Sequence, residues 1–163
     1  MKASALCVVR WIIGGCFVYL GWVKTRDPVA FLKVVREFNL LQAPLLMNVV
    51  AAWLPWFECW CGLLLVLGVG VRAAAMTLAG LLAAFSIMVW LRALQLMASF
   101  DGSFCSLSFD CGCGSGEVFV CQKLLQNGCL FIGALLLVWQ GAGRLALWPK
   151  VGFLKLNQSR VVM

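Results

Sequence analysis

Apolar residues gather in four long runs along this chain, and polar residues are concentrated in the segments between them. The runs span residues 5–23, 45–70, 73–98 and 124–143. About 20 helical residues at ~1.5 Å each cross the ~30 Å hydrocarbon core of a bilayer. Because lipid offers no hydrogen bonds to the backbone, a segment that crosses it must satisfy its own amides, as a helix does. The pattern therefore predicts four membrane-spanning helices.

A shorter amphipathic pattern follows the first run. Asp27 suits the N-cap of a helix and Pro28 its first position. Apolar residues then recur along one helical face, at Phe31, Val34, Val35 and Phe38. The segment is predicted to be a short helix lying in the membrane interface. Residues 1–163 are thus expected to form a single all-α transmembrane domain, an integral membrane four-helix bundle with a short interfacial amphipathic helix between helices 1 and 2.

Composition and charge narrow the function classes. Hydrophobic residues make up 64% of the chain, which is more than a soluble domain with a polar surface carries. The net charge of +7 comes from scattered basic residues, without a Lys/Arg run and without a glycine-rich phosphate loop. Nucleic-acid binding is therefore not expected. The lipid membrane is the expected partner of most of the surface.

The distribution of basic residues favours one orientation. With four spans, both termini lie on the same side of the membrane, and that side carries seven of the 13 Lys and Arg residues. The Lys/Arg excess marks the cytoplasmic side. We expect a multi-pass protein of a bacterial inner (cytoplasmic) membrane with both termini in the cytoplasm. The loop at residues 99–121 then faces the periplasm, where disulfides persist.

Two charged residues fall inside the predicted spans, Arg10 in the first and Glu58 in the second. A charge at the middle of a spanning helix costs about 2.5–3.5 kcal/mol, so such residues face the bundle interior and usually pair. Arg10 and Glu58 are therefore predicted to form a buried pair. The pair can clamp the two helices together, or it can act as a proton relay or a quinone contact, and the sequence leaves these alternatives open.

The chain has nine cysteines and no histidine. Five cysteines fall in the apolar spans, where cysteine packs as a small hydrophobic residue: Cys7, Cys16, Cys59, Cys61 and Cys129. The other four lie in or at the edge of the loop, at Cys105, Cys111, Cys113 and Cys121. Their spacing lacks the paired C-x₂-C knuckles of zinc sites, so no metal site is predicted.

The Cys111-Gly112-Cys113 segment is the sharpest feature of the loop. Two cysteines separated by one residue can pair only in a tight, strained ring, and strained disulfides exchange readily with a partner. Cys111 and Cys113 are therefore candidate catalytic residues, as a redox pair. The alternative is a structural disulfide between one of them and Cys105 or Cys121, which would staple the loop. Four cysteines permit three complete pairings, and Cys105 and Cys121 are disulfide candidates in each.

Several short motifs occur together, in a fixed order and spacing. They are Arg10, Gly14, Gly21 and Lys24, then Asp27-Pro28 and Phe31, then Leu54-Pro55-Trp56-Phe57-Glu58, and finally Asp110-Cys111-Gly112-Cys113. Over roughly residues 6–140 the chain resembles the DoxX-like superfamily, and within it the branch of the methylamine-utilisation protein MauE. The resemblance implies a small four-helix inner-membrane protein tied to redox processes. MauE-like proteins accompany maturation of a disulfide-rich periplasmic enzyme alongside a thioredoxin-like partner, and other DoxX-like members are subunits in quinone-linked sulfur oxidation.

These observations support two hypotheses of function. The first is an inner-membrane, redox-associated accessory protein that supports thiol–disulfide chemistry in maturation of a periplasmic partner, thioredoxin-like or disulfide-rich. The second is a non-catalytic structural subunit of a larger membrane oxidoreductase or electron-transfer complex. Whether the chain is itself an enzyme stays open, because it has no room for a separate catalytic domain. No bound cofactor is predicted, although a quinone is compatible with either hypothesis.

Overall fold

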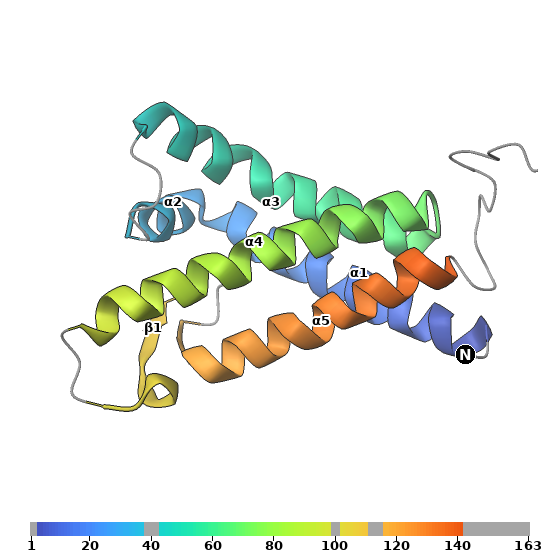
Figure 1. Ribbon diagram of the computed structural model, residues 1–163. Helices are drawn as coiled ribbons and strands as arrows, with labels where there is room; N and C mark the ends of the chain where they lie inside the picture. The colour runs from blue at the N-terminus through green and yellow to red at the C-terminus, as the bar shows by residue number, and fades with distance from the viewer. Residues whose placement is uncertain (1–2, 38–42, 99–101, 111–115, 142–163) are drawn as a thin grey trace, which may run out of the picture.

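The computed structural model describes residues 3–37, 43–98, 102–110 and 116–141, and its architecture is an all-α bundle (Figure 1). Four long helices are apolar enough to cross a membrane: α1 (Ala3–Arg26), α3 (Pro44–Leu67), α4 (Val71–Met97) and α5 (Val120–Gln140). A short helix, α2 (Pro28–Glu37), connects α1 to the chain leading into α3. The predicted four-helix membrane bundle is confirmed.

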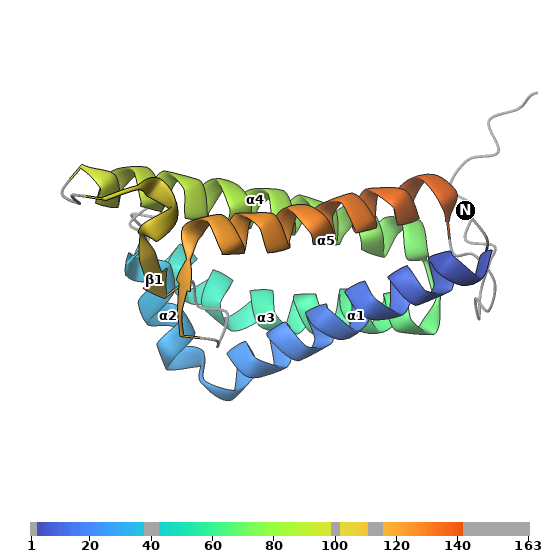
Figure 2. The same cartoon turned by 90° about the horizontal axis from the view of Figure 1, so that it is seen from below.

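The long helices form two antiparallel pairs, α1 with α3 and α4 with α5, which lie in separate layers (Figure 2). Helices α1 and α3 approach closely because glycines face the partner backbone. A side chain at Gly14 would lie 2.7 Å from the carbonyl oxygen of Gly62, and one at Gly21 would lie 2.7 Å from that of Pro55. Small residues are the usual means of such close packing between spanning helices. An apolar core that includes Leu65, Leu78 and Leu137 joins the two pairs.

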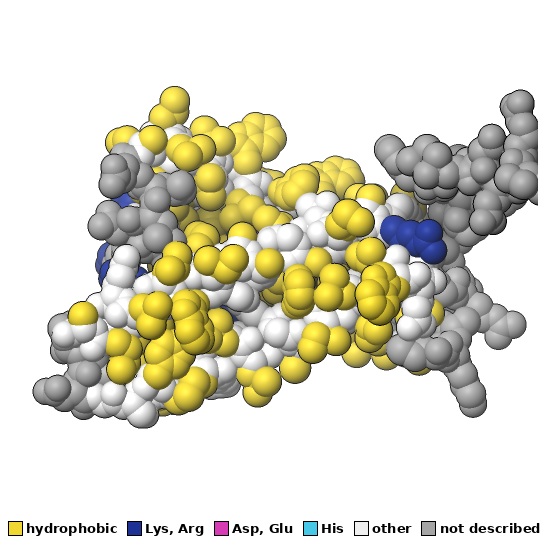
Figure 3. All heavy atoms as spheres, in the orientation of Figure 1, with side chains coloured by type: hydrophobic (Ala, Val, Ile, Leu, Met, Phe, Trp, Pro, Cys, Tyr) yellow, Lys and Arg dark blue, Asp and Glu magenta, His cyan; other side chains and the backbone are white. Residues whose placement is uncertain are grey.

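Large apolar side chains cover the outside of the bundle. Figure 3 shows them over its middle, and on this face the described Lys and Arg side chains appear toward its two ends. A hollow of about 850 Å³ runs along the outward face of α3 between Trp53, Trp56 and Trp60. Such a surface suits contact with lipid chains and is unsuited to water. The protein is accordingly a multi-pass membrane protein.

The short helix α2 forms as its sequence predicts. The backbone N–H of Ala30 donates to Asp27 Oδ1 at 2.9 Å, which is the expected N-cap bond, and Pro28 is the first helical residue. Phe31 and Val35 are buried against α3 at Ala51. Phe38, predicted on the same face, lies outside the described residues. The apolar face of α2 thus packs on the bundle.

The helix ends differ from the sequence-based bounds by up to four residues, and the end of α3 and the start of α5 are two examples. Helix α3 ends at Leu67 rather than residue 70, because Gly68 takes a left-handed conformation with φ 75° and its N–H bonds back to the last turn. Helix α5 begins at Val120, four residues earlier than predicted. Cys121 therefore lies in the first turn of a helix and not in the loop.

Candidate functional site

The cysteine loop is folded back on one end of the α4–α5 pair. It contains the short 3₁₀ helix η1 (Phe104–Ser106) and two antiparallel strands, β1 (Ser108–Asp110) and β2 (Glu117–Phe119). Apolar packing of Leu107 and Val120 against α4 anchors the loop. The rings of Trp90 and Phe104 add a contact at 5.2 Å between centroids. The sequence-based prediction gave an irregular loop here and missed both strands, which are only three residues long.

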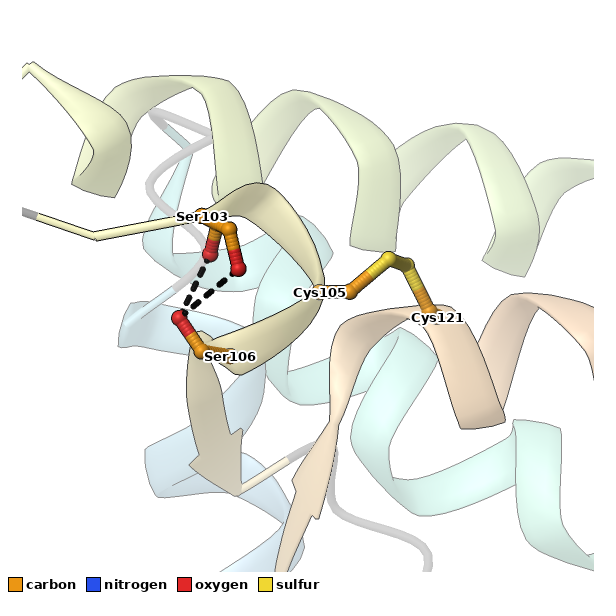
Figure 4. The surroundings of a disulfide bond; sticks show 4 residues. All are labelled: Ser103, Cys105, Ser106 and Cys121. Atoms are coloured by element: carbon orange, nitrogen blue, oxygen red, sulfur yellow. Dashed lines mark hydrogen bonds between the residues drawn. A yellow bond between two sulfur atoms is a disulfide. The ribbon is translucent and has the colours of Figure 1, made fainter.

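A disulfide joins Cys105 in η1 to Cys121 in α5, with their Cα atoms 5.0 Å apart. Figure 4 shows the bond bridging η1 to the first turn of α5. Ser106 closes η1, since its hydroxyl donates to the Ser103 carbonyl at 2.7 Å. The side chain of Cys105 is exposed and that of Cys121 is half-buried. The bond therefore ties the start of the hairpin to α5 while presenting one of its two residues to the outside.

The predicted redox pair, Cys111 and Cys113, lies outside the described residues. Its flanking residues are described. Asp110 is the last residue of β1 and pairs in register with Glu117, the first residue of β2. By chain connectivity, residues 111–116 join these two paired strand ends. In sequence, the candidate pair falls between two paired strands that a disulfide and apolar packing hold at one end of the bundle.

A buried ion pair lies between α1 and α3. Lys24 Nζ donates to both carboxylate oxygens of Glu58 at 2.8 Å, and their side chains are only 4% and 2% exposed. The same ammonium lies over two aromatic rings, 5.2 Å from the centroid of Phe31 in α2 and 4.6 Å from that of Phe85 in α4. Cations over aromatic faces are stabilised more strongly when they are desolvated. Lys24 therefore connects four helices.

The predicted pairing of Arg10 with Glu58 is wrong, although both side chains are buried. The contacts of Gly14 with Gly62 and of Gly21 with Pro55 set the register of α1 on α3. In that register Glu58 lies beside the stretch of α1 that follows Gly14, whereas Arg10 is one turn before it. Lysine side chains on helices point back toward the N-terminus, so Lys24 reaches Glu58. The Arg10 guanidinium instead donates to Cys7 Sγ, at 3.8 Å.

Helix α5 contributes further polar groups on the facing side. Lys123 and Asn127 are buried, at 6% and 4% exposure, and the Asn127 amide donates to the Ser86 hydroxyl of α4 at 3.4 Å. Lys123 is near enough for its charge to act on Glu58. Lys24, Glu58 and Lys123, called the charge cluster below, hold two cations and one carboxylate. The sequence pattern left both lysines just outside the predicted spans, because Lys24 follows the first apolar run and Lys123 precedes the last.

The other described cysteines form no disulfide: Cys7, Cys16, Cys59, Cys61 and Cys129. Cys7 and Cys61 are buried among apolar residues, as expected of cysteine in a spanning helix. Cys59 Sγ lies 3.6 Å from the Val18 carbonyl oxygen, to which it donates. Across the described ranges, no three His, Cys, Asp or Glu side chains gather into a set that could hold a metal ion. The chemistry of the described site is therefore that of a disulfide, a hairpin and a buried charge cluster.

Comparison with known proteins agrees with this architecture. The model of one protein family, described as Methylamine utilisation protein MauE, matches residues 2–140, which include the charge cluster, the disulfide and the cysteine hairpin. Neither curated proteins nor solved structures give a match. The wider DoxX-like resemblance stays a prediction. Because the match extends over most of the sequence, the chain belongs to the family of the methylamine utilisation protein MauE.

Proposed function

We propose that this membrane protein is an accessory of methylamine utilisation that performs thiol–disulfide exchange with a partner protein. The family supports the coarse role, and the cysteine hairpin supports the chemistry. The partner is a thioredoxin-like or disulfide-rich protein, because thiols and disulfides are the groups that exchange with a cysteine pair. The exchanging residues are Cys111 and Cys113.

The Cys105–Cys121 disulfide is the observation that carries this proposal. Two of the three complete pairings of the loop cysteines join Cys111 or Cys113 to Cys105 or Cys121. A bond between Cys105 and Cys121 is incompatible with both. The complete pairing that remains joins Cys111 to Cys113, which are separated in sequence by one glycine.

The proposed exchange proceeds through a mixed disulfide. A thiolate of the reduced partner attacks one sulfur of the Cys111–Cys113 bond, and the other sulfur leaves as a thiolate. A second thiol of the partner then breaks the mixed disulfide. The partner ends as a disulfide and the hairpin as a dithiol, so two electrons and two protons pass to the hairpin. The reverse sequence oxidises the hairpin and reduces the partner.

The proposed location follows from the two ends of the bundle. The start of α1 and the end of α5 lie at one end, and the hairpin lies at the other (Figure 1). We place the chain in a bacterial inner membrane with both termini in the cytoplasm, as the Lys/Arg excess favours. The hairpin is then in the periplasm, where a disulfide persists.

The charge cluster has a structural role in this proposal. Lys24 and Glu58 clamp α1 to α3 beneath the hairpin, and Arg10 stabilises the opposite half of α1. A proton relay through Glu58 is the alternative for the same residues. Replacing Lys24 separates the two roles, since loss of a clamp lowers the amount of folded protein, whereas loss of a relay lowers turnover alone.

The test traps the mixed disulfide. In membranes from cells that contain the partner, a Cys113→Ser variant should accumulate a reductant-sensitive adduct at Cys111. Cys129→Ser is the matched control, because Cys129 is an exposed, unbonded cysteine of α5 away from the hairpin. It should give no adduct and normal maturation of the partner. Absence of the adduct, together with normal maturation in Cys111→Ser, would falsify the proposal.

A second candidate function is a structural subunit of a larger membrane oxidoreductase. The row of exposed Trp53, Trp56 and Trp60 favours it, because these residues lie around the middle of α3, whereas tryptophan in spanning helices is enriched at the membrane interfaces. Such a row can serve as a face for another spanning helix. This function predicts stoichiometric co-purification with large subunits and near-normal activity of the complex with Cys111→Ser.

A further inference from the structure

We infer that the Cys105–Cys121 disulfide is itself a redox-active bond, with Cys105 as the sulfur that an incoming thiolate attacks and Cys121 as the leaving thiolate. From the proposed function it takes only that a thiol partner reaches this end of the bundle. The inference gives a chemical role to two residues that would otherwise only cross-link the loop to α5.

The two residues of the bond differ in exposure. Cys105 lies in the three-residue helix η1 and Cys121 in the first turn of α5 (Figure 4). Cys105 is exposed, whereas Cys121 is half-buried. Exchange requires the nucleophile to approach one sulfur in line with the bond, with the other sulfur as the leaving group. The exposed side chain is the one that a partner can approach, so attack falls on Cys105.

The position of Cys121 suits a leaving thiolate. It is the second residue of α5, where the unpaired backbone N–H groups and the helix dipole give a positive potential. The first turn of α5 contains no acidic residue, and its N-cap, Phe119, supplies no side-chain hydrogen bond. The start of α5 would therefore stabilise a negative charge formed at Cys121. Thiols at such positions ionise more readily than free cysteine.

Lys123 is a second and independent observation. Its side chain lies two residues beyond Cys121 and is nine-tenths buried. Among the described residues its ammonium donates to Gln126 Oε1 at a long 3.5 Å, and its charge acts on Glu58 from beyond ion-pair distance. The positive end of the helix dipole disfavours a cation in the first turn, and burial adds the cost of desolvation. Residues two apart on a helix do not face each other, so Lys123 would stabilise a thiolate at Cys121 through its electric field and not through a contact.

The step is balanced without another reactant. The partner's thiolate forms a bond to Cys105 Sγ, the Cys105–Cys121 bond breaks, and its electron pair passes to Cys121 Sγ. A second thiol of the partner then attacks the mixed disulfide, and Cys105 leaves. The partner's dithiol has become a disulfide and the two cysteines a dithiol, with the two protons of the partner's thiols transferred to Cys105 and Cys121.

The experiment isolates this bond from the hairpin pair. The full chain carrying Cys111→Ser and Cys113→Ser is placed in lipid nanodiscs and exposed to a glutathione redox buffer, and adducts are located by mass spectrometry. The expected result is reversible reduction of the folded protein through a glutathione adduct on Cys105. A bond that stays oxidised until the protein unfolds, or an adduct on Cys121 alone, would overturn the inference.

Lysine variants test the charge in the same assay. Lys123→Gln should slow reduction about tenfold, whereas Lys123→Arg should keep the rate within about twofold because the charge remains. Lys33→Gln, the same change at an exposed lysine of α2, is the matched control and should not alter the rate. Equal rates for Lys123→Gln and the parent would contradict the role of Lys123. The site of the adduct in the parent needs no lysine variant, so it remains decisive if Lys123→Gln does not fold. A failure here leaves the Cys113→Ser trapping result unaffected, so the two proposals fail separately.

Discussion

The two halves of the bundle differ in their polar contacts. In the half near the start of α1, the contact of Gly14 with Gly62 and an apolar core join the helices. In the half beneath the hairpin, Gly21 again packs on the Pro55 backbone. There the helices also meet through Lys24, Glu58 and the Asn127–Ser86 bond, and a disulfide fixes the loop above them. Apolar packing suffices to hold spanning helices together. Buried charges are costly inside a membrane, and the second half holds three of them, Lys24, Glu58 and Lys123, whereas the first half holds Arg10.

Removing one charge of the buried Lys24–Glu58 pair should cause the largest loss in the free energy of unfolding. Glu58→Gln leaves the Lys24 ammonium buried without a carboxylate, and we expect a loss of about 3–5 kcal/mol in the free energy of unfolding. Denaturant titration of the purified protein in detergent measures it. The double variant Lys24→Met with Glu58→Leu should recover most of the loss, because no charge is left buried. Strong coupling of Glu58 to Arg10 in a double-mutant cycle, with none to Lys24, would contradict the pairing.

Loss of the Cys105–Cys121 disulfide should cause the second-largest loss of stability. Replacing both Cys105 and Cys121 by Ser removes a cross-link between residues 16 apart in sequence, and we expect a loss of about 3 kcal/mol. Thermal unfolding followed by circular dichroism measures the change. Cys129→Ser, which breaks no bond, serves as the control and should leave the transition unchanged. An unchanged transition in the double variant would mean that the loop is held by its apolar contacts alone.

The apolar half can be tested with neighbouring glycines. Gly14→Ala places a methyl group 2.7 Å from the Gly62 carbonyl oxygen, so α1 and α3 must move apart, and we expect a loss of about 1–3 kcal/mol. Gly15→Ala is the matched control, because nothing lies within 4 Å of the position of its side chain. It should be neutral or slightly stabilising. The same unfolding titration compares the two variants. Equal losses of stability would show that α1 and α3 pack less closely at Gly14 than the contacts indicate.

The N-cap of α2 should give the smallest effect. Asp27→Ala removes the bond from the Ala30 N–H, and we expect a loss of about 1 kcal/mol. Asp27→Asn keeps an acceptor at the same place and should behave like the parent. Hydrogen exchange of the α2 amides measures the local change. A global loss of stability instead would place α2 within the cooperative core rather than on its edge.

The sequence predicted the helices better than it predicted their contacts. Long apolar runs leave no alternative to helices in lipid, so the four spans follow from hydrophobicity alone. The partner of Glu58 did not follow, because it depends on the register that Gly14 and Gly21 impose between distant segments. The burial of Lys24 and Lys123 did not follow either, because both stand just outside the apolar runs and burial near a helix end is set by neighbouring helices.

The pairing of the loop cysteines also could not be predicted from the sequence alone. Four closely spaced cysteines indicated disulfide chemistry, but spacing alone left three pairings open. The choice of Cys121 for Cys105 depends on α5 beginning at Val120 and on η1 packing beside it. Neither has a strong local signal, because the strands and η1 are three residues each. Tertiary packing decided what local sequence could not.

Mapping the cysteine bonds in native membranes tests the central claim most directly. Thiols are blocked before lysis with a reagent that does not cross the membrane, and the bonded peptides are identified by mass spectrometry. We predict one bond between Cys105 and Cys121 and another between Cys111 and Cys113, with any reduced pair labelled from the periplasmic side. A bond from Cys111 or Cys113 to Cys105 or Cys121, or labelling from the cytoplasmic side alone, would contradict the account.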